Sequence, residues 1–150
     1  MSSLQKQTRM REVVCVQIGK YGTTVGDLYW EKISAEHGFD NEGKCSKEVR
    51  GTSNVYFNEG SDGRYIPRSV FVDSEPGTID AIKSGKRGRL YRPENFIAGK
   101  LGTGNNFAVG YFEIGPELRE RLMDSIRKEA EACESLSGFQ ICHAVGGGTG

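Results

Sequence analysis

The sequence carries no net charge, no long apolar run and no paired-cysteine motif. Lysine plus arginine number 20, and so do aspartate plus glutamate, so no overall field favours nucleic acid or an anionic membrane as a partner. No apolar stretch approaches the roughly 20 residues of a membrane-spanning helix. The first nine residues, MSSLQKQTR, lack the hydrophobic centre of a secretory signal. We expect a cytoplasmic protein with no nucleic-acid or membrane partner, in which local geometry binds any anionic ligand.

The cysteines and histidines form no metal or catalytic motif. No pair of cysteines has CxxC spacing, and most lie among apolar residues, which is typical of buried or incidental free thiols. The sequence places neither histidine in a metal-ligand or catalytic motif with a cysteine or aspartate, so we expect structural roles for both. These residues are Cys15, Cys45, Cys133, Cys142, His37 and His143.

Two common nucleotide-binding fingerprints are also missing. GKYGTTVG (19–26) lacks the GxGxxG spacing of dinucleotide-binding proteins. GGGTG (146–150) does not have the residue spacing of a Walker motif. An NAD-type oxidoreductase would explain an α/β pattern, but it has neither this fingerprint nor a candidate hydride site here.

Glycine is abundant, and the apolar segments between the glycines have an ordered pattern. Glycine contributes 21 of the 150 residues, about twice the average share. Four short apolar runs read as buried strands, and helical spacing follows the first three. The order β-α-β-α-β-α-β predicts a doubly wound α/β fold with a mostly parallel sheet. The predicted strands are 12–18 (EVVCVQI), 69–73 (SVFVD), 95–99 (NFIAG) and 138–145 (GFQICHAV).

Four further elements are predicted from local patterns. Aromatic-rich arms on both sides of Asp62-Gly63 favour a surface hairpin. A short helix is expected after residue 75. The two long helices are marked by apolar stripes, one ending before Gly38 and one starting at Pro116. The stripes are Val25, Leu28, Tyr29, Trp30 and Ile33 in the first and Leu118, Leu122, Ile126, Ala130 and Cys133 in the second.

Glycine-rich turns follow at least three of the predicted strands. They lie at 19–22, 100–106 and 146–150. Glycines let backbone N–H groups approach an oxygen closely, and a following helix adds its positive end. The carboxyl ends of parallel strands share one edge, where ligands bind in such sheets. This edge therefore predicts a phosphate-bearing ligand.

Two charged residues at the same edge have competing interpretations. Glu75, just past the second strand, could hold a hydrated Mg²⁺, which needs only one or two protein carboxylates. It could equally be a solvated loop acid or a helix cap. Lys20 in the first turn could face a phosphate as a point charge or could face water.

The ordered motifs resemble the tubulin family, and the beta chain in particular. The resemblance implies a Rossmann-like GTP-binding domain, with 1–9 as a polar extension and 10–150 as its N-terminal part, incomplete at the C-terminal end and without a second domain. The motifs are MREVVCVQIG (10–19), VFVDSEPGTIDAIKSG (70–85), YRPENFIAGKLGTGNNFAVGYF (91–112), IRKEAEAC (126–133) and GFQICHAVGGGTG (138–150).

The resemblance implies GTP or GDP with Mg²⁺ as ligands and assigns positions to them. Lys20 stands where the family has a glutamine that touches phosphate and magnesium, and Glu75 matches the acid near the metal. Ala144 replaces a serine that contacts the nucleotide. The implied nucleotide-binding set is Gly19, Lys20, Tyr21, Gly104, Asn105, Ala144, Gly147, Gly148, Thr149 and Gly150.

Several positions depart from the family pattern and predict altered affinity. Tyr21 is larger than the family's cysteine, and Thr23 and Thr24 replace longer amide side chains. Ala144 lacks a hydroxyl, a loss of about 0.5–1.5 kcal/mol if it made one net hydrogen bond. We expect nucleotide binding that is weaker than, or different from, that of the family.

The resemblance also implies a function that this stretch cannot complete. In the family, the base-recognising asparagines and the acid that drives hydrolysis in a neighbouring subunit follow the position of Gly150, so no catalytic residue is expected within 1–150. The implied role is a GTP-binding subunit of microtubules in the cytoskeleton, paired with an alpha-tubulin-like subunit and with neighbouring subunits in a protofilament. The hairpin around Asp62-Gly63 falls in a region that the family uses for lateral contacts between protofilaments. The alternative is a truncated, degenerate, non-enzymatic fragment. One uncovered sheet edge predicts poor solubility for these residues alone.

Overall fold

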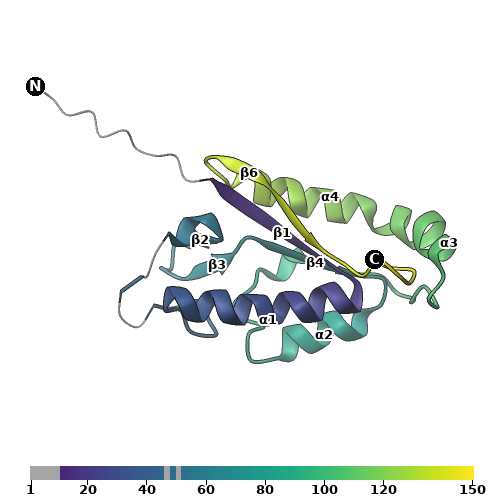
Figure 1. Ribbon diagram of the computed structural model, residues 1–150, viewed down its shortest axis with the longest axis horizontal. Coiled ribbons are helices and arrows are strands. Elements are labelled where there is room, and N and C mark those ends of the chain that lie inside the picture. Colours follow the sequence, from purple (N-terminus) through teal and green to yellow (C-terminus); the bar gives the residue numbers. More distant parts are fainter. Residues whose placement is uncertain (1–10, 46–47, 50–51) are drawn as a thin grey trace, which may run out of the picture.

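A four-stranded parallel sheet lies at the centre of the computed structural model, which describes residues 11–45, 48–49 and 52–150 (Figure 1). Its order is β5-β4-β1-β6, so the chain moves outward on one side of β1 and then crosses to the other. The predicted doubly wound α/β class is confirmed, because helices cover both faces. The strands are β1 (Glu12–Ile18), β4 (Ser69–Asp73), β5 (Phe96–Ala98) and β6 (Leu136–Cys142).

One face of the sheet is covered by α1 (Gly19–His37) and α2 (Pro76–Ser84) (Figure 1). Trp30 of α1 and Ile79 of α2 are fully buried against Phe71 of β4. Burial of such side chains contributes about 1.5–3 kcal/mol each. The core on this face is largely aromatic, and it extends from Trp30 to Phe57, which contacts the Trp30 ring edge to face.

The beginning of α1 differs from the predicted glycine turn. Only Gly19 has a positive φ (71°), and the helix starts there, directly after β1. Gly22, the other glycine of the predicted turn, lies within the helix and is buried. A Cβ on it would overlap the carbonyl oxygen of Cys142 in β6, so the position requires glycine. The small residues let α1 lie close to the sheet, so Val25 and Leu28 face outward, against the predicted apolar stripe.

The opposite face is covered by one long helical segment. It comprises α3 (Phe107–Val109), a π-helix (Gly110–Ile114) and α4 (Gly115–Glu131). The predicted helix from 116 is confirmed, but helical backbone begins nine residues earlier. The predicted stripe of α4 packs on the sheet through Leu118, Leu122 and Ile126, whereas Cys133 lies beyond the end of the helix.

The predicted hairpin is confirmed as an antiparallel pair, β2 (Phe57–Glu59) and β3 (Tyr65–Pro67). Gly63 in its turn has φ 74°, a conformation that favours glycine. Two 3-10 turns, Ser53–Val55 and Pro93–Asn95, flank these elements.

One edge of the sheet is formed by β6, which pairs with β1, and the other by β5, which pairs with β4. Strand β6 spans Leu136–Cys142, so it starts earlier and ends earlier than the predicted 138–145. Phe139 and Ile141 are 50% and 59% exposed, while every residue of β4 is buried. The expected uncovered edge is therefore present, and its effect on solubility stays a prediction.

All four cysteines are free thiols. Burial raises the pKa of Cys15, in the middle of β1, to about 12, as expected of an inert core thiol. Within the part of the chain that the structure describes, no helix has the length and apolarity to cross a membrane.

Candidate functional site

Three loops meet at Thr149, beyond the carboxyl ends of β1, β4 and β6. The Oγ1 atom of Thr149 lies 2.8 Å from Oγ of Ser74, the residue directly after β4. A Cβ on Gly19, directly after β1, would lie 3.4 Å from the Cβ of Thr149. The edge at which sequence reasoning placed the phosphate ligand is thus one continuous surface.

The loop after β5 joins this surface from the other side. A Cβ on Gly148 would lie 2.5 Å from the Asn106 carbonyl oxygen, so only glycine fits there without displacement. Gly147 has φ 94°, and a Cβ on it would lie 3.3 Å from Oδ1 of Asn105. Gly104 and Asn105 also have positive φ, 57° and 60°. This backbone is strained for ordinary residues, and such conformations gather at ligand sites.

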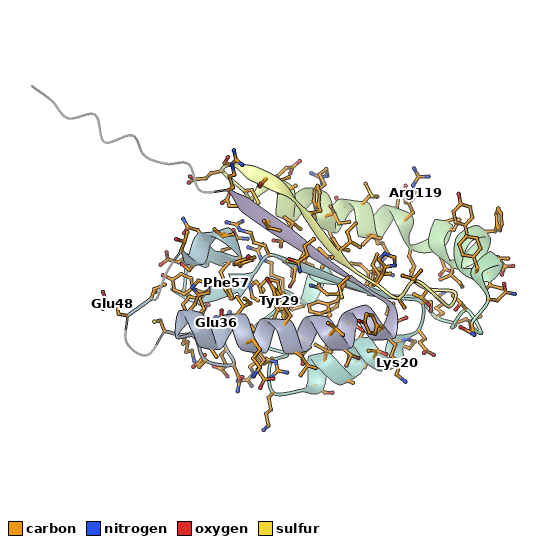
Figure 2. The ribbon with its side chains drawn as sticks, viewed as in Figure 1. Lys20, Tyr29, Glu36, Glu48, Phe57 and Arg119 are labelled. Carbon is orange, nitrogen blue, oxygen red and sulfur yellow. The ribbon has the colours of Figure 1, made fainter. Side chains whose placement is uncertain are left out.

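The remaining predicted residues lie around this centre. Lys20 and Tyr21 belong to the first turn of α1, and both are exposed; Figure 2 shows Lys20 at the start of the helix. A Cβ on Gly150 would lie 2.5 Å from the carbonyl oxygen of Ala144, so these two positions touch across the loop.

Two helices begin at this edge with their N-termini uncapped by side chains. Ile18 and Glu75 occupy the N-cap positions of α1 and α2, and neither makes a side-chain cap hydrogen bond. The first N–H groups of a helix have no partner within it, and the helix dipole adds positive potential. The surface therefore presents donors suited to an anion. The alternative role of Glu75 as a helix cap is not supported.

Asp73 is a carboxylate that the sequence analysis missed. It is the last residue of β4 and is 2% exposed, and its Oδ2 has no hydrogen-bond partner. Burial raises its pKa, against hydrogen bonds from the backbone N–H groups of Ser74 and Glu75. The clue in the sequence was an acid ending a run of apolar strand residues.

Asp73 and Glu75 together suit a hydrated divalent cation. Glu75 is exposed, and its Oε2 would lie 3.3 Å from a Cβ on Gly102 in the loop after β5. Among the described residues, no three His, Cys, Asp or Glu side chains cluster as a metal site. Mg²⁺ keeps most of its waters and needs only one or two carboxylates. The unpartnered oxygen of Asp73 and the accessible carboxylate of Glu75 meet that requirement.

A pocket of about 580 Å³ lies beside this edge, between the helical segment 107–123 and residues 148–150. Phe107, Tyr111 and Met123 line it, and each is more than half exposed. Arg119 and residues 148–150 also line it, so the pocket combines an apolar wall with one cationic side chain and the loop after β6. The candidate anion-binding groups are the backbone and hydroxyl donors at the strand ends.

Comparison with known proteins places this arrangement in a family. Residues 12–150 match the model of the Tubulin/FtsZ family, GTPase domain, and this range contains all four strands and their loops. The chain belongs to the tubulin/FtsZ family. The resemblance read from the sequence motifs is therefore confirmed.

The relatives that the tubulin-like chain resembles are beta chains. It is 51% identical over 148 residues to the tubulin beta chain of Porphyra purpurea and 50% identical over 144 residues to the tubulin beta-3 chain of Echinococcus multilocularis. The tubulin beta chain of Pneumocystis carinii is 50% identical over 148 residues. Each match covers 94% of this chain but 32–33% of the relative. The chain thus spans about a third of the length of these curated relatives.

Proposed function

We propose that this chain binds GTP or GDP at the carboxyl edge of its sheet. The observation that carries the proposal is the meeting of the loops after β1, β4 and β6 at Thr149, with two uncapped helix N-termini beside it. Membership of a GTPase-domain family supports a guanine nucleotide over other phosphate ligands. Residues 10–150 would form the N-terminal part of the binding domain.

The residues have distinct proposed roles. Gly147, Gly148 and Gly150 would offer backbone N–H groups to phosphate oxygens, with Thr149 adding its hydroxyl. Gly104 and Asn105 would close the phosphate site from the β5 side. The start of α1 would add the positive end of the helix dipole at Gly19. Next to it, Lys20 would add its charge and Tyr21 its ring, both from exposed positions. Ala144 would line the loop after β6.

Asp73 and Glu75 are the proposed holders of a hydrated Mg²⁺. Bound there, the cation would neutralise phosphate charge. The Oδ2 atom of Asp73, which is buried without a hydrogen-bond partner, supports this assignment. Lys20 would supply part of the same neutralisation as a fixed positive charge.

The proposed cellular role is that of a beta-tubulin-like subunit of microtubules in the cytoplasm. It would pair with an alpha-tubulin-like subunit and with neighbours along a protofilament. The identity of about 50% to tubulin beta chains supports this role. No residue of 1–150 is assigned to hydrolysis. The competing candidate is a non-enzymatic interaction module, favoured by the altered first turn at Lys20 and Tyr21.

Equilibrium binding to the full natural polypeptide that carries these residues tests the proposal. GTP and GDP should bind at least tenfold more tightly than ATP. Glu75→Ala should weaken GTP binding when Mg²⁺ is present and change it little in EDTA, because the carboxylate acts through the cation. Glu117→Ala, at an exposed position of α4, is the matched control. Absence of guanine-nucleotide binding would leave the interaction module as the remaining function, and equal losses in both buffers would remove the metal role.

A further inference from the structure

A pair of hydroxyl groups links the loop after β4 to the loop after β6. Ser74 Oγ and Thr149 Oγ1 are 2.8 Å apart, and either can donate the hydrogen bond. The two residues are 75 positions apart in the chain. Ser74 is 3% exposed and directly follows a fully buried strand, so its position is fixed by the sheet. Thr149 lies in irregular backbone and gains a fixed partner through this bond.

We propose that Ser74 is a positioning residue that aims the Thr149 hydroxyl at a phosphate of the bound nucleotide. The inference rests on the proposed function. A hydroxyl has one hydrogen to donate and two lone pairs to accept with. If Ser74 donates to Thr149, the hydrogen of Thr149 is free for a phosphate oxygen. Hydrogen bonds to a charged acceptor are the stronger ones, and linked bonds polarise one another.

The surroundings of Ser74 allow the direction of the pair to reverse. Its Oγ also lies 3.4 Å from Oδ1 of Asp73, to which it can donate a long hydrogen bond. Without a phosphate, Thr149 donates to Ser74 and Ser74 donates to Asp73. With a phosphate, Ser74 donates to Thr149, which donates to the ligand. The change needs only rotation of two hydroxyl hydrogens, so the site is preorganised for its ligand.

A double-mutant cycle tests the inference on the full natural polypeptide, with GDP affinity as the readout. Ser74→Ala and Thr149→Val should each weaken GDP binding by about 2- to 10-fold, the equivalent of one net hydrogen bond. The double variant should bind GDP as Thr149→Val does, because Ser74 acts only through Thr149. A merely structural serine would weaken binding by the same factor in both backgrounds.

Ser69→Ala is the matched control. Ser69 lies at the opposite end of β4, is 1% exposed and has a hydroxyl without a partner, so its removal should leave GDP affinity unchanged. Ser74→Cys keeps the volume but donates weakly, and it should lose affinity within the same range if the alanine variant does not fold. The free energy of unfolding is measured for every variant to separate binding from folding.

The outcomes separate this inference from the function on which it rests. Full affinity in Ser74→Ala, or independent losses in the double variant, would overturn the positioning role while leaving nucleotide binding intact. A wild-type protein that does not bind GDP would overturn both.

Discussion

The two ends of the same parallel sheet are built from different chemistry. At the amino end, Arg68 Nη2 donates to Glu12 Oε1 at 2.8 Å, and both side chains are almost fully buried. Glu12 also accepts a hydrogen bond from the N–H of Ser135, and Arg68 donates to the carbonyl of Ala132. At the carboxyl end, glycine loops meet around Thr149, and two helix N-termini have no side-chain cap.

The difference separates stability from binding. At the amino end, Arg68 and Glu12 satisfy one another and tie β1, the residue before β4 and the end of α4 together, although the neighbouring buried hydroxyl of Ser69 has no partner. At the carboxyl end, Oδ2 of the buried Asp73 has no hydrogen-bond partner among the described residues. Unpaired polar groups are costly unless a ligand satisfies them. We therefore expect amino-end substitutions to lower stability first and carboxyl-end substitutions to lower affinity first.

The largest effect should come from breaking the ion pair at the amino end. Arg68→Ala leaves the buried Glu12 carboxylate without its charged partner, which costs about 3–5 kcal/mol. Urea unfolding measures the change. The control is Arg127→Ala on α4, whose ion pairs with Asp124 and Glu131 are solvent-exposed, and its midpoint should hardly move. Equal midpoints for the two variants would break the comparison.

A smaller loss of stability is expected when a methyl group is added to Gly148, at the carboxyl end of the sheet. Gly148→Ala forces its Cβ against Thr103 and Asn106, a clash that costs about 1–3 kcal/mol. Because the loop must shift, GDP affinity should fall more than tenfold. In Gly146→Ala the added Cβ meets open space, so affinity and stability should stay close to wild type. If both alanines behave alike, the close approach at Gly148 does not hold the loop.

The smallest expected effect is a pH dependence of the free energy of unfolding, caused by Glu129 near the amino end of the sheet. Glu129 is 1% exposed and accepts a hydrogen bond from Asn95 at 2.7 Å. Burial raises its pKa, against the Asn95 hydrogen bond and the Arg92 charge. A raised pKa means that the folded state holds the proton more tightly. The contribution of Glu129 to stability is therefore full at low pH and declines as pH rises past the ordinary carboxyl range, by at most about 1.4 kcal/mol per pH unit.

Urea unfolding at a series of pH values measures this slope. Glu129→Gln should flatten it, whereas Glu131→Gln, two residues along α4 and exposed, should leave it unchanged. A slope that persists in Glu129→Gln would assign the titration to another group.

Most of the architecture follows from local pattern, and the errors share one cause. The β-branched run at 12–18 and the apolar stripe of α4 are correct in kind and close in extent. The predicted apolar stripe of α1 was wrong at Val25 and Leu28, which are exposed. The face of the helix that contains Gly22 packs against β6 instead. No periodicity encodes such a close approach between distant segments. The π-helix ahead of α4 was missed for a similar reason. Its first residue, Gly110, lies against the carbonyl oxygen of Gly148 in a distant loop.

The candidate site was only partly visible from the sequence. Glycine-rich turns after successive strands located the edge, and the resemblance named the positions. Ser74 and Asp73 were not singled out, because a serine and an aspartate at a strand end are ordinary turn residues. Their burial, the hydroxyl bond to Thr149 and the unpartnered oxygen exist only in the folded chain.

By itself, the sequence determined the fold class and the family, and it predicted the edge of the sheet at which we propose that a phosphate binds. Period-two and period-3.6 patterns and glycine conformations are local properties, so they can be read along the chain. Only the tertiary structure decided which groups meet at that edge. Ser74 and Thr149 touch because β4 and β6 lie on either side of β1 in one parallel sheet, and strand order is set by packing across the whole domain.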